Sequence, residues 1–369
     1  MENGSNMDEL TNFVDEQYLN CLRKIKEEGV LKQTRSGDVL SVFGLSMRFN
    51  LKYGFPVLTT KKMFMKGFIY ELLWFLRGDT NIKYLIDNGV NFWTPDAYRF
   101  YNELVTKHLR LVNKATVDEM NSFSLTMEQF VEKVEKQESI KLAVRKNGHG
   151  NLVQIYYTYG DLGPVYGKQW RHWGENDVDQ IQMIINTLKK NPFDRRMLLT
   201  GYNPDVIYDI ALPPCHTIYM FNTRPLTHEE RVEWCQDNIH EEWVNPSEQI
   251  MDDNGCPKYA LSLWFMCRSQ DMALGTPANI MSASLLLSMV AQCVNMVPDE
   301  VIWNGCDCHI YLNQMDGVDE QLTRDPHKYG LPRLKLNPIV KDIDMFEYED
   351  IVIEGYESYP TIKMPLSVG

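Results

Sequence analysis

Hydrophobic positions in the N-terminal part of the chain recur at helical and strand spacing. Residues 8–29 predict an amphipathic helix, because apolar side chains return every three or four positions. The apolar positions of this helix are Leu10, Phe13, Val14, Tyr18, Leu22 and Ile25. A glycine-containing turn at 34–38 precedes a predicted strand at 39–50, and PVLTTKK at 56–62 predicts a second extended segment. Residues 68–78 predict an apolar helix that ends at its terminal glycine.

The second half of the chain continues this alternation. A glycine-rich loop with aromatic residues is expected at 159–170, and an amphipathic helix is expected at 178–190. The apolar segments 215–223 and 258–266 predict two strands, and 280–296 predicts a buried helix. No long linker rich in Pro, Ser or Gly separates these elements, which favours one domain over the whole chain.

Two charged segments interrupt the pattern and are interpreted as insertions into the domain 1–369. Residues 97–155 are rich in Lys, Glu and Asn and are predicted to be mostly helical. Residues 224–257 are highly acidic and are far longer than the connection that a hairpin needs. A solvated surface excursion is the preferred interpretation of the acidic segment, and a partner-binding surface is the alternative.

The composition narrows the class of protein. The formal net charge is −13 and the pI is near 5.1, whereas a duplex-binding protein carries a basic surface, so nucleic acid is not expected as the main ligand. The eight cysteines are scattered and lack zinc-finger spacing, which predicts free thiols in a reducing compartment. The sequence shows no signal peptide and no apolar run long enough for a membrane span, which predicts a cytoplasmic protein.

Cys215 is the first candidate for chemistry, in the sequence LPPCHT at the start of a predicted apolar strand. A thiol forms a thiolate at neutral pH only beside a positive charge or a hydrogen-bond donor. The adjacent His216 is weak support by itself, since free cysteines are commonly buried for packing. A structural cysteine and a nucleophile therefore both remain open from these residues alone.

Several arginines occupy positions that would suit an anionic ligand. Arg35 lies in the glycine-containing turn, Arg195 and Arg196 follow a proline turn, and Arg268 precedes Ser269 in an otherwise apolar strand. Guanidinium groups bind phosphate through paired hydrogen bonds. Solvation at the surface explains the first three equally well, but a charge within a strand needs a partner, so Arg268 indicates a ligand or an ion pair.

Two further polar residues lie in apolar sequence. Glu71 is either a buried acid with a raised pKa or a residue at the edge of its helix. Asn279 either caps the following helix or presents its amide to a ligand. No metal is expected at CDCHIYLN (306–313), because on a strand its aspartate and histidine would face away from its two cysteines.

Long motifs of the chain resemble the thymidylate synthase family. They run in family order from about residue 8 to the C-terminus, and only the two insertions lie outside them. The motifs are LSVFGLSMRFN, GFPVLTTKK, ELLWFLRGDTNI, YGDLGPVYGKQWRHW, DRRMLL, LPPCHT, RSQDMALGTPANI, GCDCHIYLN and EGYESYPTIKMP. The resemblance implies an α/β (α+β) fold with a twisted mixed sheet and packed helices, and a homodimer formed through the sheet. It also implies transfer of a one-carbon unit from 5,10-methylenetetrahydrofolate to C5 of dUMP.

By this resemblance, Cys215 is the nucleophile that adds to C6 of the pyrimidine. Arg268 would lie beside the thiol, lower its pKa and also bind the phosphate. The other expected phosphate ligands are Arg35, Ser269 and, donated across the dimer interface, the pair Arg195 and Arg196.

The resemblance also assigns the remaining site residues. Glu71 would organise water and proton transfers, Tyr166 would lie near the C5 proton, and His216 would be the histidine that follows the nucleophile. The other expected ligands are His309 and Tyr311 for the deoxyribose, Asp271 and Trp93 for the folate, and Asn279 for O4 and N3–H of uracil. An asparagine at the last position favours dUMP, since relatives that act on dCMP typically have aspartate there.

Departures from the family pattern concentrate in the residues expected near the folate. They are Thr94-Pro95-Asp96 after Trp93, together with Tyr202, Met220, Cys267 and Ala278. Looser folate contacts would let water instead of hydride add to the methylene on C5, so the favoured hypothesis is a dUMP hydroxymethylase that makes 5-hydroxymethyl-dUMP, such as a phage enzyme of DNA modification. A thymidylate synthase making dTMP and dihydrofolate is the alternative, favoured by Trp93 and the tail KMPLSVG. An inactive member with a structural or RNA-binding role is the remote alternative.

Overall fold

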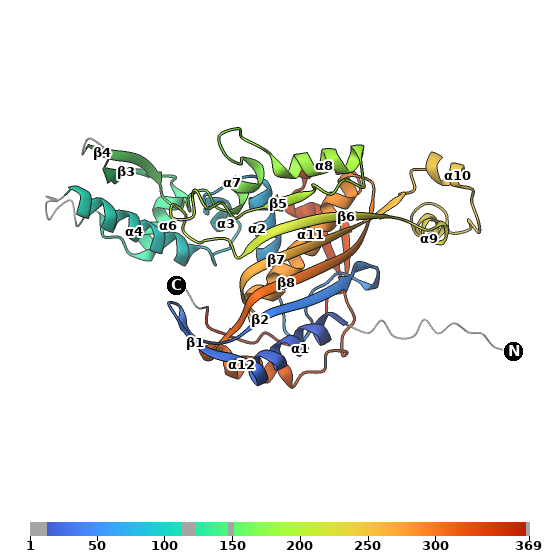
Figure 1. The fold of residues 1–369 in the computed structure, drawn as a ribbon, viewed down its shortest axis with the longest axis horizontal. Coiled ribbons are helices and arrows are strands. Elements are labelled where there is room, and N and C mark those ends of the chain that lie inside the picture. Colours follow the sequence, from blue (N-terminus) through green and yellow to red (C-terminus); the bar gives the residue numbers. More distant parts are fainter. Residues whose placement is uncertain (1–12, 113–120, 122, 147–150, 367–369) are drawn as a thin grey trace.

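The computed structural model describes residues 13–112, 121, 123–146 and 151–366 (Figure 1). The predicted N-terminal helix is confirmed as α1 (Phe13–Glu28), although its expected position Leu10 lies outside the described residues. Within the described ranges, no helix combines the length and the apolar character that crossing a membrane would require.

A six-stranded sheet with the order β1-β2-β8-β7-β6-β5 forms the centre of the molecule. Its strands are β1 (Val30–Thr34), β2 (Gly37–Asn50), β5 (Leu198–Thr200), β6 (His216–Pro225), β7 (Tyr259–Asp271) and β8 (Val297–Tyr311). The strands β7 and β8 run parallel, and every other neighbouring pair is antiparallel. The expected mixed sheet is therefore confirmed, and so is the turn at 34–38, which joins β1 to β2.

Helices cover one face of this sheet. In Figure 1 the strands β6, β7 and β8 lie in front of α11 (Gly275–Cys293), which packs against β7 and β8. The helix α2 (Met65–Leu76) packs against α11, and α1 packs against β2. Alternate residues of each strand point to the face that the helices cover, and the side chains on that face are buried. They include Tyr219, Phe221, Leu263, Phe265, Val301 and Trp303.

The opposite face of the sheet carries two apolar rows. The strand register aligns Leu198, Met220, Trp264 and Ile302 in one row, and Ile218 with Met266 in the next. Leu198 is 37% exposed and Met220 is 39% exposed in the single chain. Apolar rows of this kind on an open sheet face favour contact with another surface.

The first insertion is more varied than the predicted, mostly helical segment. It contains α4 (Thr94–Val112), α6 (Met127–Glu135) and an antiparallel hairpin of β3 (Ser139–Lys146) with β4 (Leu152–Thr158). The prediction missed this hairpin, in which Leu142 and Ala143 are buried although the flanking residues are charged. Buried residues of the insertion, including Phe130 and Val134, join the main hydrophobic core.

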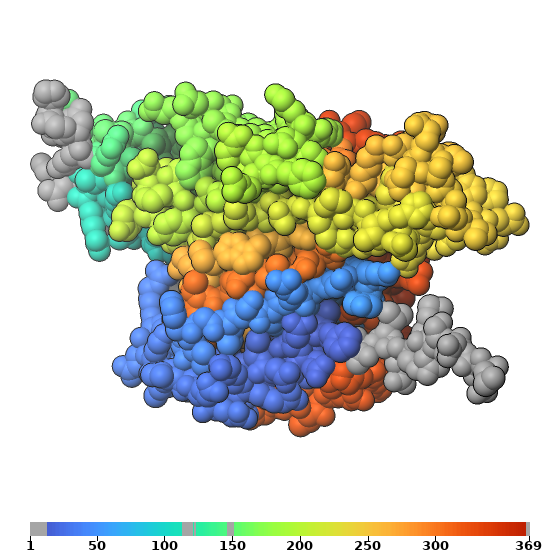
Figure 2. Space-filling view, turned by 45° about the vertical axis from the view of Figure 1, so that its right-hand side comes forward, coloured from blue at the N-terminus to red at the C-terminus, as the bar shows by residue number. Residues whose placement is uncertain are grey.

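The second insertion connects β6 to β7 and forms α9 (His228–Asn238) and α10 (Glu248–Asp253). It has a small core of its own, in which Cys235, Met251 and Cys256 are buried. The two insertions lie at opposite ends of the molecule, with α4 at one end and α9 at the other (Figures 1 and 2).

The remaining elements complete the layers around the sheet. The predicted helix at 178–190 is confirmed as α8, whereas the loop predicted at 159–170 ends earlier, because its second half forms the short helix α7. A small hairpin pairs β9 with β10 near the C-terminus. These elements are α3 (Lys83–Asp87), α7 (Tyr166–Arg171), α8 (Gln180–Lys190), α12 (Met315–Leu322), β9 (Arg333–Leu336) and β10 (Ile351–Glu354).

Candidate active site

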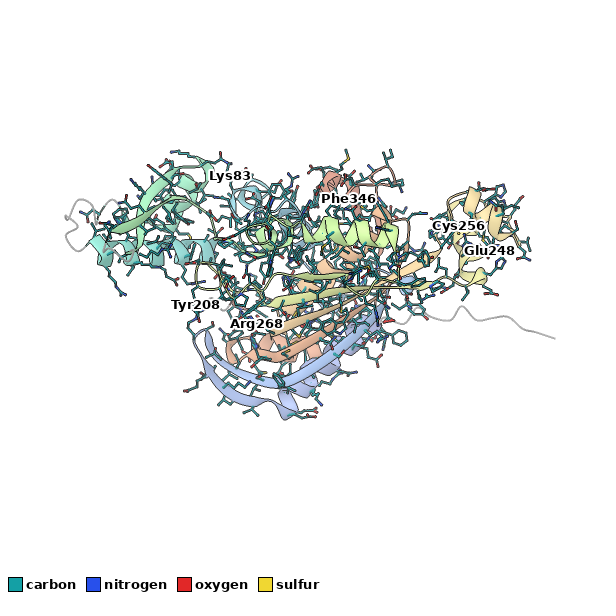
Figure 3. The ribbon with its side chains drawn as sticks, turned by 45° about the horizontal axis from the view of Figure 1, so that its top comes forward. Lys83, Tyr208, Glu248, Cys256, Arg268 and Phe346 are labelled. Carbon is teal, nitrogen blue, oxygen red and sulfur yellow. The ribbon has the colours of Figure 1, made fainter. Side chains whose placement is uncertain are left out.

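Cys215 lies directly before β6, where the backbone is held from two sides. Its N–H donates to the Tyr166 hydroxyl oxygen at 2.7 Å, and its carbonyl accepts from the Arg268 N–H at 2.8 Å. The guanidinium of Arg268 donates to the carbonyls of Pro214 and Pro213 at 2.8 and 2.9 Å. The fold thus brings Cys215 and Arg268 together from neighbouring strands, and Figure 3 shows Arg268 at the same end of the sheet as the loop that carries Tyr208.

The electrostatic setting of the Cys215 thiol combines opposing effects. Burial raises the thiol pKa above its ordinary value, the positive charge of Arg268 lowers it, and the carboxylates of Asp271 and Asp96 raise it. Arg268 therefore lowers the Cys215 pKa, as expected, but burial raises this pKa by more. Because burial outweighs the Arg268 charge, this partly exposed thiol needs a further positive charge or a hydrogen-bond donor to form a thiolate.

Aromatic rings form a wall beside the thiol. The rings of Tyr166 and His216 stack with centroids 4.3 Å apart, and the Tyr219 hydroxyl lies 2.8 Å from His216 Nδ1. Burial lowers the pKa of His216 to about 3, so this imidazole is neutral over the physiological range. His216 therefore does not supply the positive charge that the thiolate needs, and its roles are packing and orientation through Tyr219.

Glu71 and Trp93 form a second pair at the same wall. The Trp93 Nε1–H donates to Glu71 Oε1 at 2.6 Å, and the Trp93 ring meets the Tyr166 ring edge to face at 6.3 Å. Burial raises the pKa of Glu71 to about 7, and the hydrogen bond from Trp93 opposes that rise only in part. Of the two interpretations left open by the sequence, the Trp93 hydrogen bond and the direction of the pKa shift support an acid with a raised pKa, in a partly buried position.

The ends of β7 and β8 place several expected nucleotide ligands next to one another. Asp271 pairs with His309 in the parallel register, and Ser269 pairs with Asp307. The rings of His309 and Tyr311 meet edge to face at 5.2 Å. As expected, the aspartate and the histidine of CDCHIYLN share one side of β8, where Asp307 Oδ1 lies 3.3 Å from His309 Nδ1.

Arg35 approaches this group from the tip of the β1–β2 hairpin. Ser36 hydrogen-bonds the Tyr311 hydroxyl, and the Arg35 charge is close enough to lower the tyrosine pKa, although burial raises it overall. The hairpin turns over two residues between Thr34 and Gly37, whose φ of 127° favours glycine. The exposed Arg35 therefore lies on the same side of the molecule as Tyr311.

Asn279 lies on α11 and interacts with Cys267 and Gln270 of β7. Its Nδ2 donates to Gln270 Oε1 at 3.2 Å, which fixes the amide and leaves Oδ1 free to accept a hydrogen bond. Of the two interpretations left open by the sequence, helix capping is excluded, because the helix starts at Gly275. The fixed amide instead points to ligand recognition.

Within one chain, the fold does not bring Arg195 and Arg196 next to the other candidate site residues. Both are exposed, and Arg196 pairs with Asp194 at 2.6 Å between Nη2 and Oδ2. They lie just before β5, the edge strand next to the apolar rows. This position leaves their expected role across a dimer interface as a prediction.

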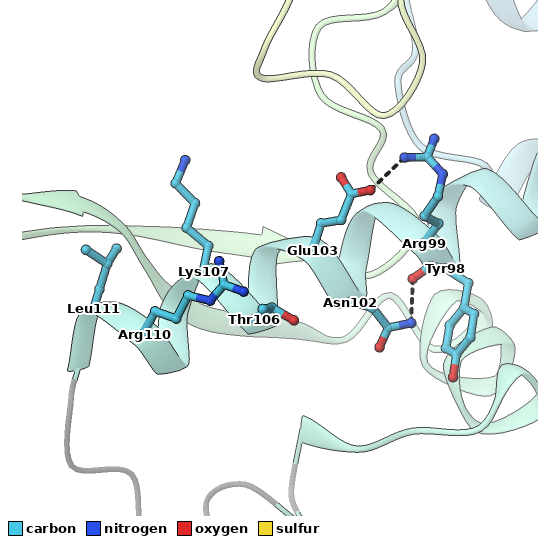
Figure 4. A pocket seen from close by; sticks show the side chains of 8 residues that line it. All are labelled: Tyr98, Arg99, Asn102, Glu103, Thr106, Lys107, Arg110 and Leu111. Carbon is cyan, nitrogen blue, oxygen red and sulfur yellow. Dashed lines mark hydrogen bonds and ion pairs between the residues drawn. The ribbon is translucent and has the colours of Figure 1, made fainter. Parts of the chain in front are cut away.

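The sequence interpretation missed two polar links to the site. Arg99 on α4 donates to the carbonyl of Ala211 at 2.6 Å and pairs with Asp96 at 3.0 Å. It also pairs with Glu103 at 2.8 Å, as Figure 4 shows. Gln314, which is 1% exposed, donates to Asp271 Oδ2 at 3.1 Å. The spacing of Asp96, Arg99 and Glu103 along one helix face was a usable signal for the first link, whereas nothing in the sequence connects Gln314 to Asp271.

The fold and this cluster define an α/β protein with a partly exposed cysteine beside an arginine at the start of a central strand. A sequence profile described as Thymidylate synthase matches residues 16–368. A thymidylate synthase of Mycoplasma mobile is 40% identical over 354 residues, covering 96% of this chain and 100% of that protein. One of Phytoplasma mali is 37% identical over 354 residues, covering 95% of this chain and 99% of that protein. The chain therefore belongs to the thymidylate synthase family.

Membership of the thymidylate synthase family establishes the general class of reaction. The chain is a one-carbon transferase of dUMP, and 5,10-methylenetetrahydrofolate is the co-substrate. The partly buried carboxylate, the indole and the fixed amide around Cys215 are groups that suit a planar heterocycle and its polar edge. Among the described residues, no group of three or more His, Cys, Asp or Glu side chains is arranged to hold a metal ion.

Proposed function

We propose that this chain is a thymidylate synthase in the strict sense, which converts dUMP to dTMP and its folate co-substrate to dihydrofolate. The observation that carries the proposal is the likeness at 40% identity to a thymidylate synthase over 100% of its length. The hydroxymethylase hypothesis drawn from the departures is not supported by these relatives, which favour the alternative product.

The position of one departure also weakens the hydroxymethylase hypothesis. Met220 lies in the apolar row on the open face of the sheet, whereas Tyr219 next to it faces the core and the His216 ring. A substitution at Met220 therefore does not loosen contacts beside the thiol. The Trp93 indole is held by Glu71, so a folate-binding element expected from the family is rigid here.

The proposed reaction starts with Cys215. The thiolate adds to C6 of dUMP, and the electron pair moves to C5, which then bonds to the methylene carbon of the co-substrate. Loss of the C5 proton and of tetrahydrofolate leaves a methylene on C5, and hydride from the tetrahydrofolate reduces it to methyl. The thiolate then leaves C6, which restores the free enzyme and releases dTMP.

The neighbouring side chains are proposed to serve separate steps. Arg268 would bind the phosphate and favour the thiolate, because its charge lowers the Cys215 pKa. Glu71, with a pKa of about 7, can hold or release a proton near neutral pH. Asn279 would accept from N3–H of uracil and donate to O4, while Tyr166 lies against the thiol where the C5 proton departs. The remaining proposed ligands are Arg35, Ser269, Asp271, His309 and Tyr311.

Product analysis tests the proposed function directly. Purified protein is incubated with dUMP and 5,10-methylenetetrahydrofolate, and the nucleotides are identified by chromatography and mass spectrometry. We expect dTMP and one equivalent of dihydrofolate. A nucleotide that is heavier than dTMP by one oxygen atom, formed with release of tetrahydrofolate, would instead establish a hydroxymethylase.

Covalent trapping tests whether Cys215 is the nucleophile. With 5-fluoro-dUMP and the co-substrate, the wild-type chain should form a stable adduct that peptide mapping locates at Cys215. The variant Cys215→Ser should form none and should lose activity by more than about a thousandfold. The buried Cys308→Ser variant is the matched control, since this thiol faces the core and should leave trapping intact. An unmodified wild-type chain would favour an inactive family member.

We also propose a homodimer built on the open sheet face, and a single domain with two insertions. The two apolar rows and the edge position of Arg195 and Arg196 support a dimer in which these arginines reach the partner subunit's phosphate site. The inclusion of Phe130 and Val134 in the main core supports one domain.

A further inference from the structure

Gln314 joins three parts of the structure that are distant in sequence. It lies between β8 and α12, is 1% exposed, and its side chain makes three hydrogen bonds. Its Nε2 donates to Asp271 Oδ2 at 3.1 Å and to the Pro365 carbonyl at 3.2 Å, and its Oε1 accepts from the Tyr311 N–H at 3.4 Å. One amide thus contacts the end of β7, the end of β8 and the C-terminal segment.

The Asp271 carboxylate is oriented by this amide. Its Oδ1 accepts from the backbone N–H groups of Ala273 and Leu274 at 2.8 and 3.1 Å, so that oxygen is fully engaged. Oδ2 accepts from Gln314 and keeps one lone pair for a ligand donor. Without the amide, the carboxylate keeps two backbone bonds but loses the bond that fixes the ligand-facing oxygen.

The C-terminal segment is docked by a short series of contacts that leads to Gln314. The Tyr359 N–H donates to the Thr59 carbonyl at 2.8 Å, and Arg324 donates to the Pro360 carbonyl at 2.7 Å. Ile362 is buried, but Lys363, Pro365 and Leu366 are exposed. The bond from Gln314 to the Pro365 carbonyl is therefore the last polar contact in the described part of this segment.

We infer that Gln314 is a positioning residue that couples the orientation of Asp271 to the docking of the C-terminal segment. The inference rests on the proposed function, in which Asp271 faces the folate. Both hydrogen atoms of one amide are engaged at once, one by the carboxylate and one by the tail carbonyl. Loss of either partner frees the amide to rotate, so each contact stabilises the other.

Two variants of Gln314 test whether its side chain acts as a hydrogen-bond donor or only fills space. Gln314→Ala removes the amide, whereas Gln314→Glu keeps the shape but removes both hydrogens and places a second carboxylate beside Asp271. We expect the KM for 5,10-methylenetetrahydrofolate to rise roughly tenfold in the alanine variant, as for one hydrogen bond to a carboxylate, and further in the glutamate variant. The KM for dUMP should change little.

Tail docking is measured separately by proteolysis. Trypsin can cut after the exposed Lys363, and intact-mass analysis reports the loss of the residues beyond it. Cleavage should be roughly fivefold faster in both Gln314 variants, as for one lost hydrogen bond. The control is Gln292→Ala, a glutamine of α11 that donates to the carbonyls of Asn337 and Val340 and whose hydrogen bonds involve neither Asp271 nor the C-terminal segment.

The outcomes separate cleanly. Raised folate KM and faster tail cleavage in both variants support the inference, while a change in only one readout, or a glutamate variant that behaves like the wild type, overturns the coupling. Gln314→Asn, which keeps an amide on a shorter stem, replaces the alanine variant if that protein does not fold, and intermediate effects are then expected. Failure of the proposed function would show differently, as a wild-type chain that makes no dTMP.

Discussion

The ionised carboxylate of Glu71 is destabilised by its partly buried environment. We therefore predict that removing this charge increases the stability of the fold but lowers the activity. The pKa of Glu71 is raised from 4.5 to about 7, so the stabilising protonated form is fully present below pH 4.5 and is lost as the pH rises through 7. At pH 8, Glu71→Gln should therefore increase the free energy of unfolding by about 2 kcal/mol. The Trp93 hydrogen bond survives, because the amide oxygen still accepts it.

Urea unfolding at several pH values measures this effect. The gain in the Gln variant should shrink as the pH is lowered from 8 toward 4.5, and kcat should fall by roughly a hundredfold because the proton acceptor is gone. A gain that does not depend on pH would mean that packing, not ionisation, explains it.

Asn279 is predicted to set the choice of base. Its Nδ2 is engaged by Gln270, and in the proposed function its Oδ1 would accept from N3–H of uracil. Asn279→Asp should lower kcat/KM for dUMP by roughly a hundredfold, because a site that pairs the wrong polar groups loses specific binding. Steady-state assays with dUMP and dCMP check this, and an unchanged preference for dUMP would rule out the role.

At the scale of elements, α4 is connected to the loop that leads to the nucleophile. Arg99→Ala removes the hydrogen bond to the Ala211 carbonyl, four residues before Cys215, and the pair with Asp96. We expect kcat to fall roughly tenfold with little change in KM for dUMP, because a misplaced reacting group costs rate. Arg110→Ala, an exposed arginine of the same helix, is the control, and equal kcat values for the two variants would contradict the link.

Periodicity predicted α1 and α8, whose buried residues recur every three or four positions, whereas nearly continuous apolar runs predicted α2 and α11, which are buried on most of their surface. It missed the β3–β4 hairpin, in which Lys141 and Arg145 lie on either side of the buried pair Leu142 and Ala143, and in which a bulge follows Ala143. The capping box of Thr227 with Glu230, which starts α9, was a local signal for a helix in the acidic insertion.

The candidate site was predicted from motifs more fully than from physical chemistry. The sequence placed Cys215, Arg268 and Glu71 as candidates, but it could not show that burial dominates the thiol pKa. The thiol pKa also depends on the carboxylates of Asp96 and Asp271, which lie far away in the chain and whose distance from the thiol is set only by folding. The link through Gln314 is of the same kind.

For the whole molecule, the open sheet face predicts the oligomeric state. Met220→Glu places a charge in the apolar row shared with Trp264 and should shift the protein to a monomer in analytical ultracentrifugation, since an unpaired buried charge costs several kcal/mol. Tyr156→Glu on β4, where the ring is 77% exposed, should leave the assembly unchanged. A monomeric wild-type protein would contradict the proposed interface.

Complementation tests whether the arginines cross that interface. Cys215→Ser and Arg196→Ala should each be nearly inactive alone, because one lacks the nucleophile and the other lacks a phosphate ligand. After mixed refolding, activity should return, since a heterodimer holds one site with both groups intact. No recovery would show that Arg196 serves the site of its own chain.

The strand order has a consequence for how the molecule is made. β2 pairs with β1 on one edge and with β8 on the other, so on the second edge Val39 has no partner until Tyr311 has been synthesised. During synthesis, the long strand β2 leaves the ribosome with an unpaired edge, and such edges are prone to aggregate. Contacts this distant in sequence also slow folding. The sheet can therefore close only after nearly the whole chain has been synthesised, and until then the nascent polypeptide is a natural client for chaperones.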